Sequence, residues 1–529
     1  MASNQSQRVE VYDTTLRDGT QAEGLALSVE DKLRVARQLD RLGLTYLEGG
    51  WPGSNPRDRE FFAALPTLGL KRIQVAAFGS THHPSRTPQD DANLAELLAA
   101  GTEIITLVGK SSLRHVQSQL QIAPERNLAM AADSVAYLRQ KGRRVFFDAE
   151  HFFDGFKEDP EYTCAVLAAA AQAGAEALVL CDTNGGSLPE LVALATARVK
   201  EAHPGLTIGI HTHNDAELAV ANTLAAVSAG ARQVQGTLGG FGERCGNANL
   251  CSLIPNLQLK LGYQCLEPAR LQLLSETARL VHELANLPPH RFAPYVGKSA
   301  FSHKGGLHIS AVEKDPALYE HVNPEAVGNV RRFLVSDLSG RAAILNKAKE
   351  WGLDLGADDP EVKAILANLK ARENEGYQYE GAEASFELLM NRAMGRHQRY
   401  FELVGFRVMN FKDAEGELPR AEATVRVRVG GLEEHTAAMG HGPVNALDRA
   451  IRKALVRFFP RLNEVRLVDY KVRVLSGADG TGARVRVLIE SSDGVSSWGT
   501  VGVSFDVLEA SYQALGDSIR YKLFKDQQV

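Results

Sequence analysis

Two histidines stand two residues apart in the stretch GIHTHND, at positions 211 and 213. Side chains of a β-strand alternate between its two faces, so His211 and His213 point to the same side if this stretch is a strand. Asp18, in the distant stretch DTTLRDGT, would add a carboxylate. An Asp-His-His set suits a divalent metal such as Mg, Mn, Zn or Co and leaves positions open for a substrate. A His-x-His pair alone is more often an incidental polar pair, so the hypothesis depends on elements that bring Asp18 close.

Arg17 directly precedes Asp18, and the small residues Thr14, Thr15 and Gly19 surround the pair. A surface ion pair before a turn is the simpler interpretation, but a bare salt bridge does not need small neighbours. A guanidinium can hold a planar carboxylate through two hydrogen bonds while a metal polarises an adjacent carbonyl. Because a 2-oxo acid carries those two groups side by side, Arg17 is a candidate for substrate binding.

One unit recurs from residue 9 to about 262: a short apolar run ends in polar residues, and an amphipathic or alanine-rich segment follows. Eight such units in about 255 residues match the count and length of a (β/α)8 TIM barrel, and they disfavour a doubly wound open sheet. Ser28 opens the first helical segment as an N-cap, with Asp31 placed to complete a capping box. We therefore predict an α/β fold with a catalytic barrel over residues 8–265. The apolar runs are VEVYDTTLRDG, TYLEGGWP, RIQVAAFGS, EIITLVGK, RVFFDAEHF, ALVLCDTNGG, TIGIHTHND and QVQGTLGGFGE.

The barrel would gather the candidate residues at one mouth, because TIM-barrel active sites lie at the C-terminal ends of the strands. Asp18 ends the first run and the two histidines end the seventh, so only one strand would separate them. Asn247, after the eighth run, could supply a neutral oxygen ligand. Glu150 and Thr183 end the fifth and sixth runs and face the same mouth. Glu150 is a base, a residue that orients one, or a rim charge.

Two further regions with different secondary-structure patterns follow the predicted barrel. Residues 266–395 are helical and irregular, which predicts an accessory or linker region. Residues 396–529 return to alternating strands in two βββα sets. A duplicated α+β module joined to a barrel predicts a regulatory domain that senses an amino acid or forms a dimer.

Composition excludes several classes of protein. The formal net charge of −5, with no basic tail, argues against nucleic acid as a partner. No apolar run approaches the roughly 20 residues that span a bilayer, and the first residues lack the apolar core of a secretion signal. The five cysteines show no C-x-x-C pair, which favours reduced thiols in a cytoplasmic protein.

Three motifs, DTTLRDGTQ, HTHND and GFGERCGNANL, together resemble those of metal-dependent TIM-barrel acyltransferases and lyases. This family includes 2-isopropylmalate and homocitrate synthases and hydroxymethylglutaryl-CoA lyase. The segment SAFSHKGGLHISAV resembles the accessory region of the synthases, and the C-terminal repeat resembles their regulatory domain, which the lyases lack. The resemblance implies a Claisen-type condensation of acetyl-CoA with a 2-oxo acid, followed by thioester hydrolysis. Pyruvate is the favoured acid, with 2-oxoisovalerate and 2-oxoglutarate as alternatives.

The resemblance also implies roles for individual residues. It assigns the metal to Asp18, His211 and His213 with Asn247 nearby, stabilisation of the enolate or ketone oxygen to Arg17, and contacts to the acids to Glu150 and Thr183. His308 and Tyr319 match accessory-region residues that reach a neighbouring protomer's active site, which implies a homodimer. Family members often carry an acidic residue where this chain has Ser310, so the base stays open between His308 and Glu150.

The resemblance further implies that the C-terminal domain binds a branched-chain amino acid, isoleucine in particular. Two alternatives are a lyase that runs the reverse cleavage and a non-catalytic sensor built on an inactive barrel. The C-terminal domain argues against the lyase. The presence of Asp18, His211 and His213 argues against the inactive barrel.

Overall fold

The structure is a computed structural model that describes residues 8–334, 341–353, 355–356, 359–412, 414–415, 418–475 and 477–528. The chain divides into two compact units. Met1–Phe301 and His321–Arg331 form the first, and Ser302–Glu320 and Arg332–Val529 form the second. Each unit has hydrophobic clusters of its own.

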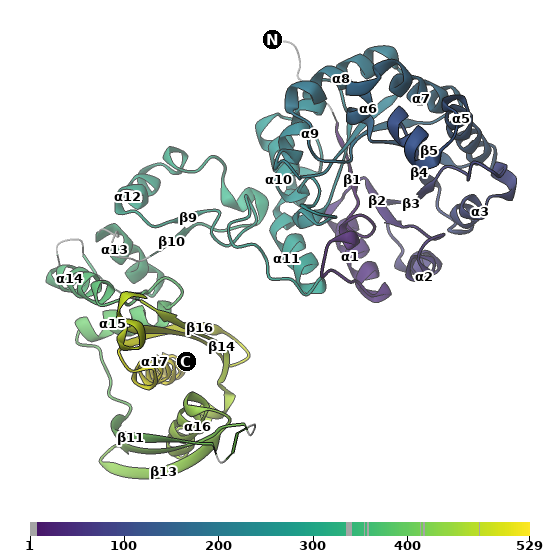
Figure 1. Ribbon diagram of the computed structural model, residues 1–529. Helices are drawn as coiled ribbons and strands as arrows, with labels where there is room; N and C mark the ends of the chain where they lie inside the picture. The colour runs from purple at the N-terminus through teal and green to yellow at the C-terminus, as the bar shows by residue number, and fades with distance from the viewer. Residues whose placement is uncertain are drawn as a thin grey trace. The chain divides into compact units, whose positions relative to one another are not determined.

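The first unit is a closed barrel of eight strands in sequence order (Figure 1). Neighbouring strands run parallel, and β1 pairs with both β2 and β8, which closes the sheet. The predicted (β/α)8 barrel is therefore confirmed. The strands are β1 (Glu10–Asp13), β2 (Tyr46–Gly50), β3 (Gln74–Ser80), β4 (Ile104–Lys110), β5 (Arg144–Glu150), β6 (Ala177–Asp182), β7 (Thr207–Thr212) and β8 (Gln233–Gly236).

Helices surround the barrel on the outside (Figure 1), and a large apolar cluster fills the space between them and the strands. They are α1 (Val29–Leu42), α2 (Pro56–Ala64), α3 (Ala92–Ala99), α4 (Leu113–His115), α5 (Pro124–Gln140), α6 (Phe152–Glu158), α7 (Pro160–Gln172), α8 (Pro189–Ala202), α9 (Ala219–Ser228), α10 (Leu250–Pro255) and α11 (Leu274–Leu284).

Helix α1 shows how local sequence sets these boundaries. The Ser28 hydroxyl accepts a hydrogen bond from the Asp31 amide at 3.2 Å, and the Asp31 carboxylate accepts one from the Ser28 amide at 3.0 Å. This is the predicted capping box, which satisfies two amides at the helix start. Gly43 ends the helix in the left-handed conformation with φ of 88°, which glycine adopts without steric cost.

The inward-facing side chains of the barrel form two layers of opposite chemistry. We call the first the aromatic layer: it is a buried apolar cluster of Tyr12, Tyr46, Ala76, Ile104, Phe146 and Ala177. Two residues further along β2 and β5, and therefore on the same face, Glu48 and Asp148 follow Tyr46 and Phe146. Together with His211 on β7 and Gln235 on β8 they form a second set, which we call the charged layer; all four residues are buried.

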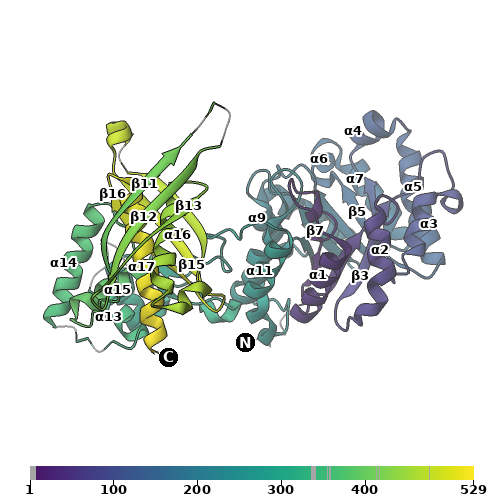
Figure 2. The same cartoon turned by 90° about the horizontal axis from the view of Figure 1, so that it is seen from below.

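The second unit contains two similar α+β modules, which confirms the predicted βββα repeat (Figure 2). Each module is a three-stranded antiparallel sheet with one helix against it. The modules are β11 (Glu402–Phe411), β12 (Arg420–Val429) and β13 (Leu432–Gly440) with α16 (Pro443–Val456), and β14 (Arg466–Val474), β15 (Val485–Ser492) and β16 (Ser497–Ser504) with α17 (Val507–Gln528).

Short elements precede these modules in the same unit. Two-residue strands form a small parallel sheet, and four helices follow one another along the chain. These elements are β9 (Ser302–His303), α12 (Gly306–Lys314), β10 (Arg332–Phe333), α13 (Arg341–Glu350), α14 (Pro360–Asn374) and α15 (Glu383–Ala393). Across the described residues, no helix has both the length and the apolar character needed to cross a membrane.

Candidate metal centre and substrate cavity

Three buried side chains converge where β1 and β7 end. Nε2 of His211 lies 3.1 Å from Oδ2 of Asp18, and Nε2 of His213 lies 3.9 Å from the same oxygen. The two Nε2 atoms are 3.4 Å apart. One donor atom from each residue therefore lies within 4.8 Å of the other two, which is the spacing of ligands around one cation.

Strand alternation and barrel closure bring these residues together. Thr212, between the histidines, points to the opposite face, where its hydroxyl donates to the Ala219 carbonyl at 3.0 Å. Strand β8 pairs with both β7 and β1, so Asp18 is only one strand away from the histidines. The Thr15 hydroxyl also accepts a hydrogen bond from the Leu238 amide at 2.9 Å, which anchors the loop after β1 to the loop after β8.

Asn247 places an unused oxygen beside this set. It forms an isolated antiparallel β-bridge with His213, and its Nδ2 donates to the Phe241 carbonyl at 3.1 Å. Its buried Oδ1 has no hydrogen-bond partner among the described residues. A buried acceptor without a partner costs free energy, which a bound cation would recover. The two imidazole nitrogens, the carboxylate and the amide oxygen are donors that fit a divalent metal.

The charges around the set favour the ligand form of Asp18. Burial alone would raise the pKa of Asp18, but the charge of Arg17 and the hydrogen bond and charge of His211 hold it well below its ordinary value. Burial and the charge of His211 lower the pKa of His213 to about 4. Burial lowers the pKa of His211, yet the hydrogen bond and charge of Asp18 outweigh burial and raise it.

Arg17 is held rigidly at the edge of the set. Its Nε contacts Oε2 of Glu48 at 2.5 Å, and its Nη1 lies 3.6 Å from Oδ1 of Asp18. Its Cζ stacks 3.8 Å from the centre of the Phe78 ring. The ion pair and the cation–π contact fix the plane of the guanidinium, which is the property needed to recognise a planar carboxylate.

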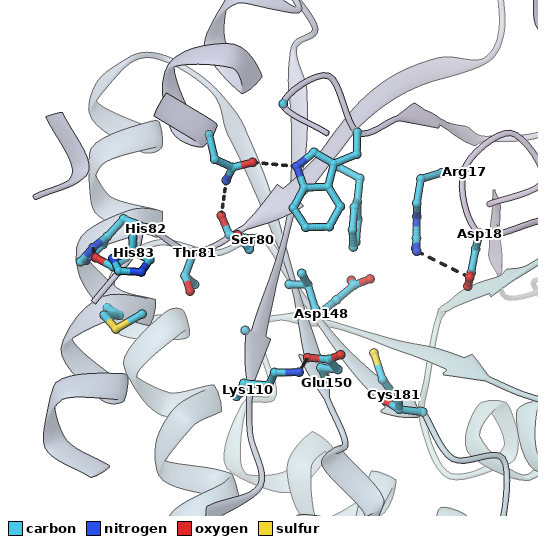
Figure 3. Close-up of a pocket in the computed structure, with 18 of the residues that line it drawn as sticks. Arg17, Asp18, Ser80, Thr81, His82, His83, Lys110, Asp148, Glu150 and Cys181 are labelled. Carbon is cyan, nitrogen blue, oxygen red and sulfur yellow. Dashed lines mark hydrogen bonds and ion pairs between the residues drawn. The ribbon is translucent and has the colours of Figure 1, made fainter. Parts of the chain in front are cut away.

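A cavity of about 910 Å³ opens at this end of the barrel. Its lining includes Arg17, Asp18, Glu150, Thr183, His211 and His213. Figure 3 shows the Arg17–Asp18 pair and the Lys110–Glu150 pair in the same cavity, with Asp148 drawn between them. The volume falls within the range of pockets that enclose ligands of drug size, so it exceeds the needs of a small 2-oxo acid.

Neighbouring residues determine how Glu150 and Thr183 face the cavity. Nζ of Lys110, on the adjacent strand, lies 2.5 Å from Oε2 of Glu150. The Thr183 hydroxyl accepts a hydrogen bond from the His151 amide at 2.8 Å, and this leaves its own proton available for donation. Nη2 of Arg244 donates to the Thr183 carbonyl at 2.8 Å, which fixes the backbone there.

Two buried acids of this site were missed by the sequence analysis. Glu48 accepts hydrogen bonds from Arg17 and from the Tyr12 hydroxyl, the latter at 3.0 Å, and burial raises its pKa. Burial, followed by the charge of Glu48, raises the pKa of Asp148 to about 7. A signal for Asp148 was present: it precedes Glu150 by two residues inside an apolar run, so it shares the inward face.

His308 and Tyr319 belong to the second compact unit. Their rings stack with centroids 4.2 Å apart and planes inclined by 29°. Tyr319 is 48% exposed, so the pair presents an aromatic hydroxyl and an imidazole on the surface of that unit.

Protein-family models match most of the chain. The HMGL-like model matches residues 8–281. A homocitrate synthase post-HMGL domain-like model matches residues 295–376, and the LeuA allosteric (dimerisation) domain matches residues 380–523.

Curated relatives align with the chain over nearly its full length. It is 54% identical to the (R)-citramalate synthase of Geobacter sulfurreducens, over 98% of this chain and 98% of that protein. It is 52% identical to the (R)-citramalate synthase of Aquifex aeolicus, over 99% of each. Identity is lower, at 31%, to the 2-isopropylmalate synthase of Heliobacterium modesticaldum, over 98% of each.

Proposed function

The chain belongs to the HMGL-like family, within its (R)-citramalate synthase branch, and from this premise we infer its reaction. It condenses acetyl-CoA with pyruvate and water to give (R)-citramalate and CoA. The observation that carries this conclusion is the end-to-end identity with (R)-citramalate synthases, at 54% and 52%. The cavity with Arg17 beside an Asp-His-His set supplies the groups that this chemistry needs.

Pyruvate is the acceptor that the comparisons favour. Identity falls from 54% with a citramalate synthase to 31% with a 2-isopropylmalate synthase, although both alignments cover 98% of the chain. The expectation from the sequence is thus supported, and 2-isopropylmalate or homocitrate synthesis is not favoured. Each methylene of the acceptor changes selectivity by only about 1–3 kcal/mol in an apolar pocket, so a test must compare acids directly.

We propose that Asp18, His211, His213 and Asn247 hold a divalent cation, with Mg, Mn, Zn and Co as candidates. When bound there, such a cation acts as a Lewis acid toward the ketone oxygen of the 2-oxo acid. The support is the distance of 3.1 Å between His211 Nε2 and Asp18 Oδ2 together with the unpaired Oδ1 of Asn247 among the described residues.

The proposal assigns substrate binding to Arg17 and Thr183. Glu48 and Phe78 fix the orientation of the planar Arg17 guanidinium. This group binds the carboxylate of the 2-oxo acid and stabilises negative charge on the adjacent ketone oxygen. The Thr183 hydroxyl donates to a carboxylate oxygen of the bound acid. Both side chains line the same cavity, so one small acid can contact both.

The proposed steps begin with removal of a proton from the acetyl methyl group by Glu150 or by His308. The resulting enolate carbon attacks the ketone carbon, which forms the new C–C bond and leaves an alkoxide beside Arg17. The protonated base then returns its proton to this alkoxide, which gives the hydroxyl group of the product and regenerates the base. Water then attacks the thioester carbonyl, the C–S bond breaks, and the CoA thiolate takes a proton. We propose, as the resemblance implies, that the protein is a homodimer in which His308 and Tyr319 of one protomer act in the active site of its partner.

We also propose that isoleucine, a branched-chain amino acid, binds the C-terminal modules and regulates turnover. The support is the match of residues 380–523 to the LeuA allosteric (dimerisation) domain. Calorimetry of the full-length chain should show heat on titration with isoleucine and a matching loss of turnover. Absence of heat with isoleucine, leucine and valine would remove this part of the proposal.

The reaction is tested by release of CoA thiol from acetyl-CoA with pyruvate, 2-oxoisovalerate and 2-oxoglutarate in parallel. Each assay is run with and without a chelator of divalent metals. We expect the highest kcat/KM with pyruvate and loss of turnover on chelation. A higher kcat/KM with 2-oxoisovalerate would contradict the acceptor, and undiminished turnover after complete metal removal would contradict the metal centre.

A further inference from the structure

A chain of buried hydrogen bonds crosses the barrel interior from His211 to Asp148. Nδ1 of His211 lies 2.9 Å from Oε1 of Gln235, the inward-facing residue at the adjacent position of β8. Nε2 of Gln235 donates to Oδ1 of Asp148, on β5, at 3.3 Å. Gln235 is fully buried and Asp148 is 3% exposed, so water has little access to replace either bond.

The chemistry of the three groups sets the direction of every hydrogen bond in this chain. Nε2 of Gln235 is the atom that faces Asp148, so the amide donates to that carboxyl oxygen. The carbonyl oxygen of Gln235 then faces His211 and also accepts, which places the imidazole proton on Nδ1. In the neutral imidazole the lone pair of His211 therefore lies on Nε2, the nitrogen that is 3.1 Å from Asp18. The hydrogen bond between these two atoms belongs to the protonated imidazole, whose Nε2 proton a bound cation would replace. With the amide reversed, Nδ1 would accept and the proton would move to Nε2.

We propose that Gln235 and Asp148 are positioning residues that hold His211 in the tautomer able to bind the divalent cation. This inference rests on the proposed metal centre. Neither residue needs to touch the cation: Gln235 acts on His211, and Asp148 acts on Gln235. Partners of this kind, one bond beyond the ligand, commonly change metal affinity by about 10- to 100-fold.

Gln233 provides a matched control on the same strand. It lies two residues before Gln235 on the same inward face and is fully buried, but no atom of its side-chain amide has a hydrogen-bond partner among the described residues. Replacing Gln233 by leucine removes an amide of the same size from the same strand. It leaves the hydrogen bonds that connect His211, Gln235 and Asp148 in place. The Q233L variant therefore shows how much the loss of one buried amide by itself changes metal affinity and stability.

The experiment measures Zn²⁺ affinity of the full-length protein by competition with a chromophoric chelator, and the visible spectrum of the Co²⁺ form. We expect Q235L to weaken Zn²⁺ binding by about 10- to 100-fold and to alter the Co²⁺ spectrum. D148N should weaken binding in the same direction, because its amide no longer fixes Gln235. The double variant should bind no more weakly than the weaker single variant, since both act through one chain. Q233L should match the wild type.

Thermal melting of the metal-free variants separates folding from metal binding. Wild-type affinity in a folded Q235L would overturn the inference, as would an equal loss in Q233L or an additive loss in the double variant. If the wild type itself binds neither Zn²⁺ nor Co²⁺, the proposed metal centre fails and not merely the role of Gln235.

Discussion

On β2 and β5 the aromatic layer and the charged layer lie two residues apart, yet they have opposite chemistry. In the aromatic layer, the rings of Tyr46 and Phe146 meet edge to face with centroids 5.3 Å apart. In the charged layer, the residues two positions further along, Glu48 and Asp148, are buried carboxylates whose pKa values are raised by burial. The first layer gains free energy from apolar burial, whereas the second costs free energy that Arg17 only partly offsets.

This difference indicates that the two layers have separate functions within one barrel. The aromatic layer closes the interior and supports the strands from which the charged layer projects. The charged layer keeps two carboxyl groups and one imidazole where they are poorly solvated, an arrangement typical of sites that bind charged ligands. Substitutions in the two layers should therefore separate stability from metal binding and turnover.

The largest expected effect is at Asp18, which contacts His211 of the charged layer. Asp18→Ala removes the carboxylate that both histidines face, and a metal contribution of several kcal/mol corresponds to a loss of at least about 10³-fold in kcat. Steady-state turnover and metal content check this result, and circular dichroism should show an intact fold. Wild-type turnover in a metal-free Asp18→Ala protein would refute the assignment.

Phe146→Ala tests the aromatic half. Truncation of this buried ring should lower the free energy of unfolding by about 3–5 kcal/mol, because it removes apolar contacts and leaves a cavity. Urea denaturation measures the loss. Zn²⁺ affinity of the folded variant should stay within a few-fold of the wild type, and a loss as large as that of Asp18→Ala would show that the layers are not separate.

Arg17→Lys tests whether the geometry or only the charge of the clamp matters. Lysine keeps the positive charge but lacks the planar fork and the stacking on Phe78. We expect KM for pyruvate to rise about 10- to 100-fold, the value of one hydrogen bond between charged groups, with little change in Zn²⁺ affinity. An unchanged KM would show that Arg17 does not contact the acid.

The smallest effect is expected outside both layers. Ser28→Ala removes the hydroxyl of the capping box at α1 and should cost about 1 kcal/mol of stability. Its kinetic constants should equal those of the wild type at temperatures well below unfolding. Altered kinetics at such temperatures would mean that α1 influences the mouth of the barrel.

The fold was largely predictable because its signals are local and repeated. Eight apolar runs with intervening helical patterns specify the barrel, and the same alternation places His211 and His213 on one face. The proximity of Asp18 then follows from closure, because β8 pairs with β7 and with β1.

The unpredicted part of the site is the set of contacts across the barrel interior. Glu48 and Asp148 stand inside apolar runs. Alternation places Asp148 on the inward face with Glu150, but a single sequence does not distinguish a functional acid from a paired structural one at either position. The bond between Gln235 and Asp148 joins residues 87 positions apart on strands that do not pair directly. Spacing along the chain carries no information about such a contact, which depends on the packed interior of the closed barrel.

The most direct test of the proposed condensation is the fate of the acetyl methyl carbon. The full-length protein is incubated with acetyl-CoA labelled with ¹³C at that carbon and with pyruvate, and the products are followed by NMR. We predict that the label appears in the methylene carbon of (R)-citramalate, with one CoA released for each molecule formed. Release of CoA with the label found only in acetate would contradict the account, because it would show thioester hydrolysis without formation of a carbon–carbon bond.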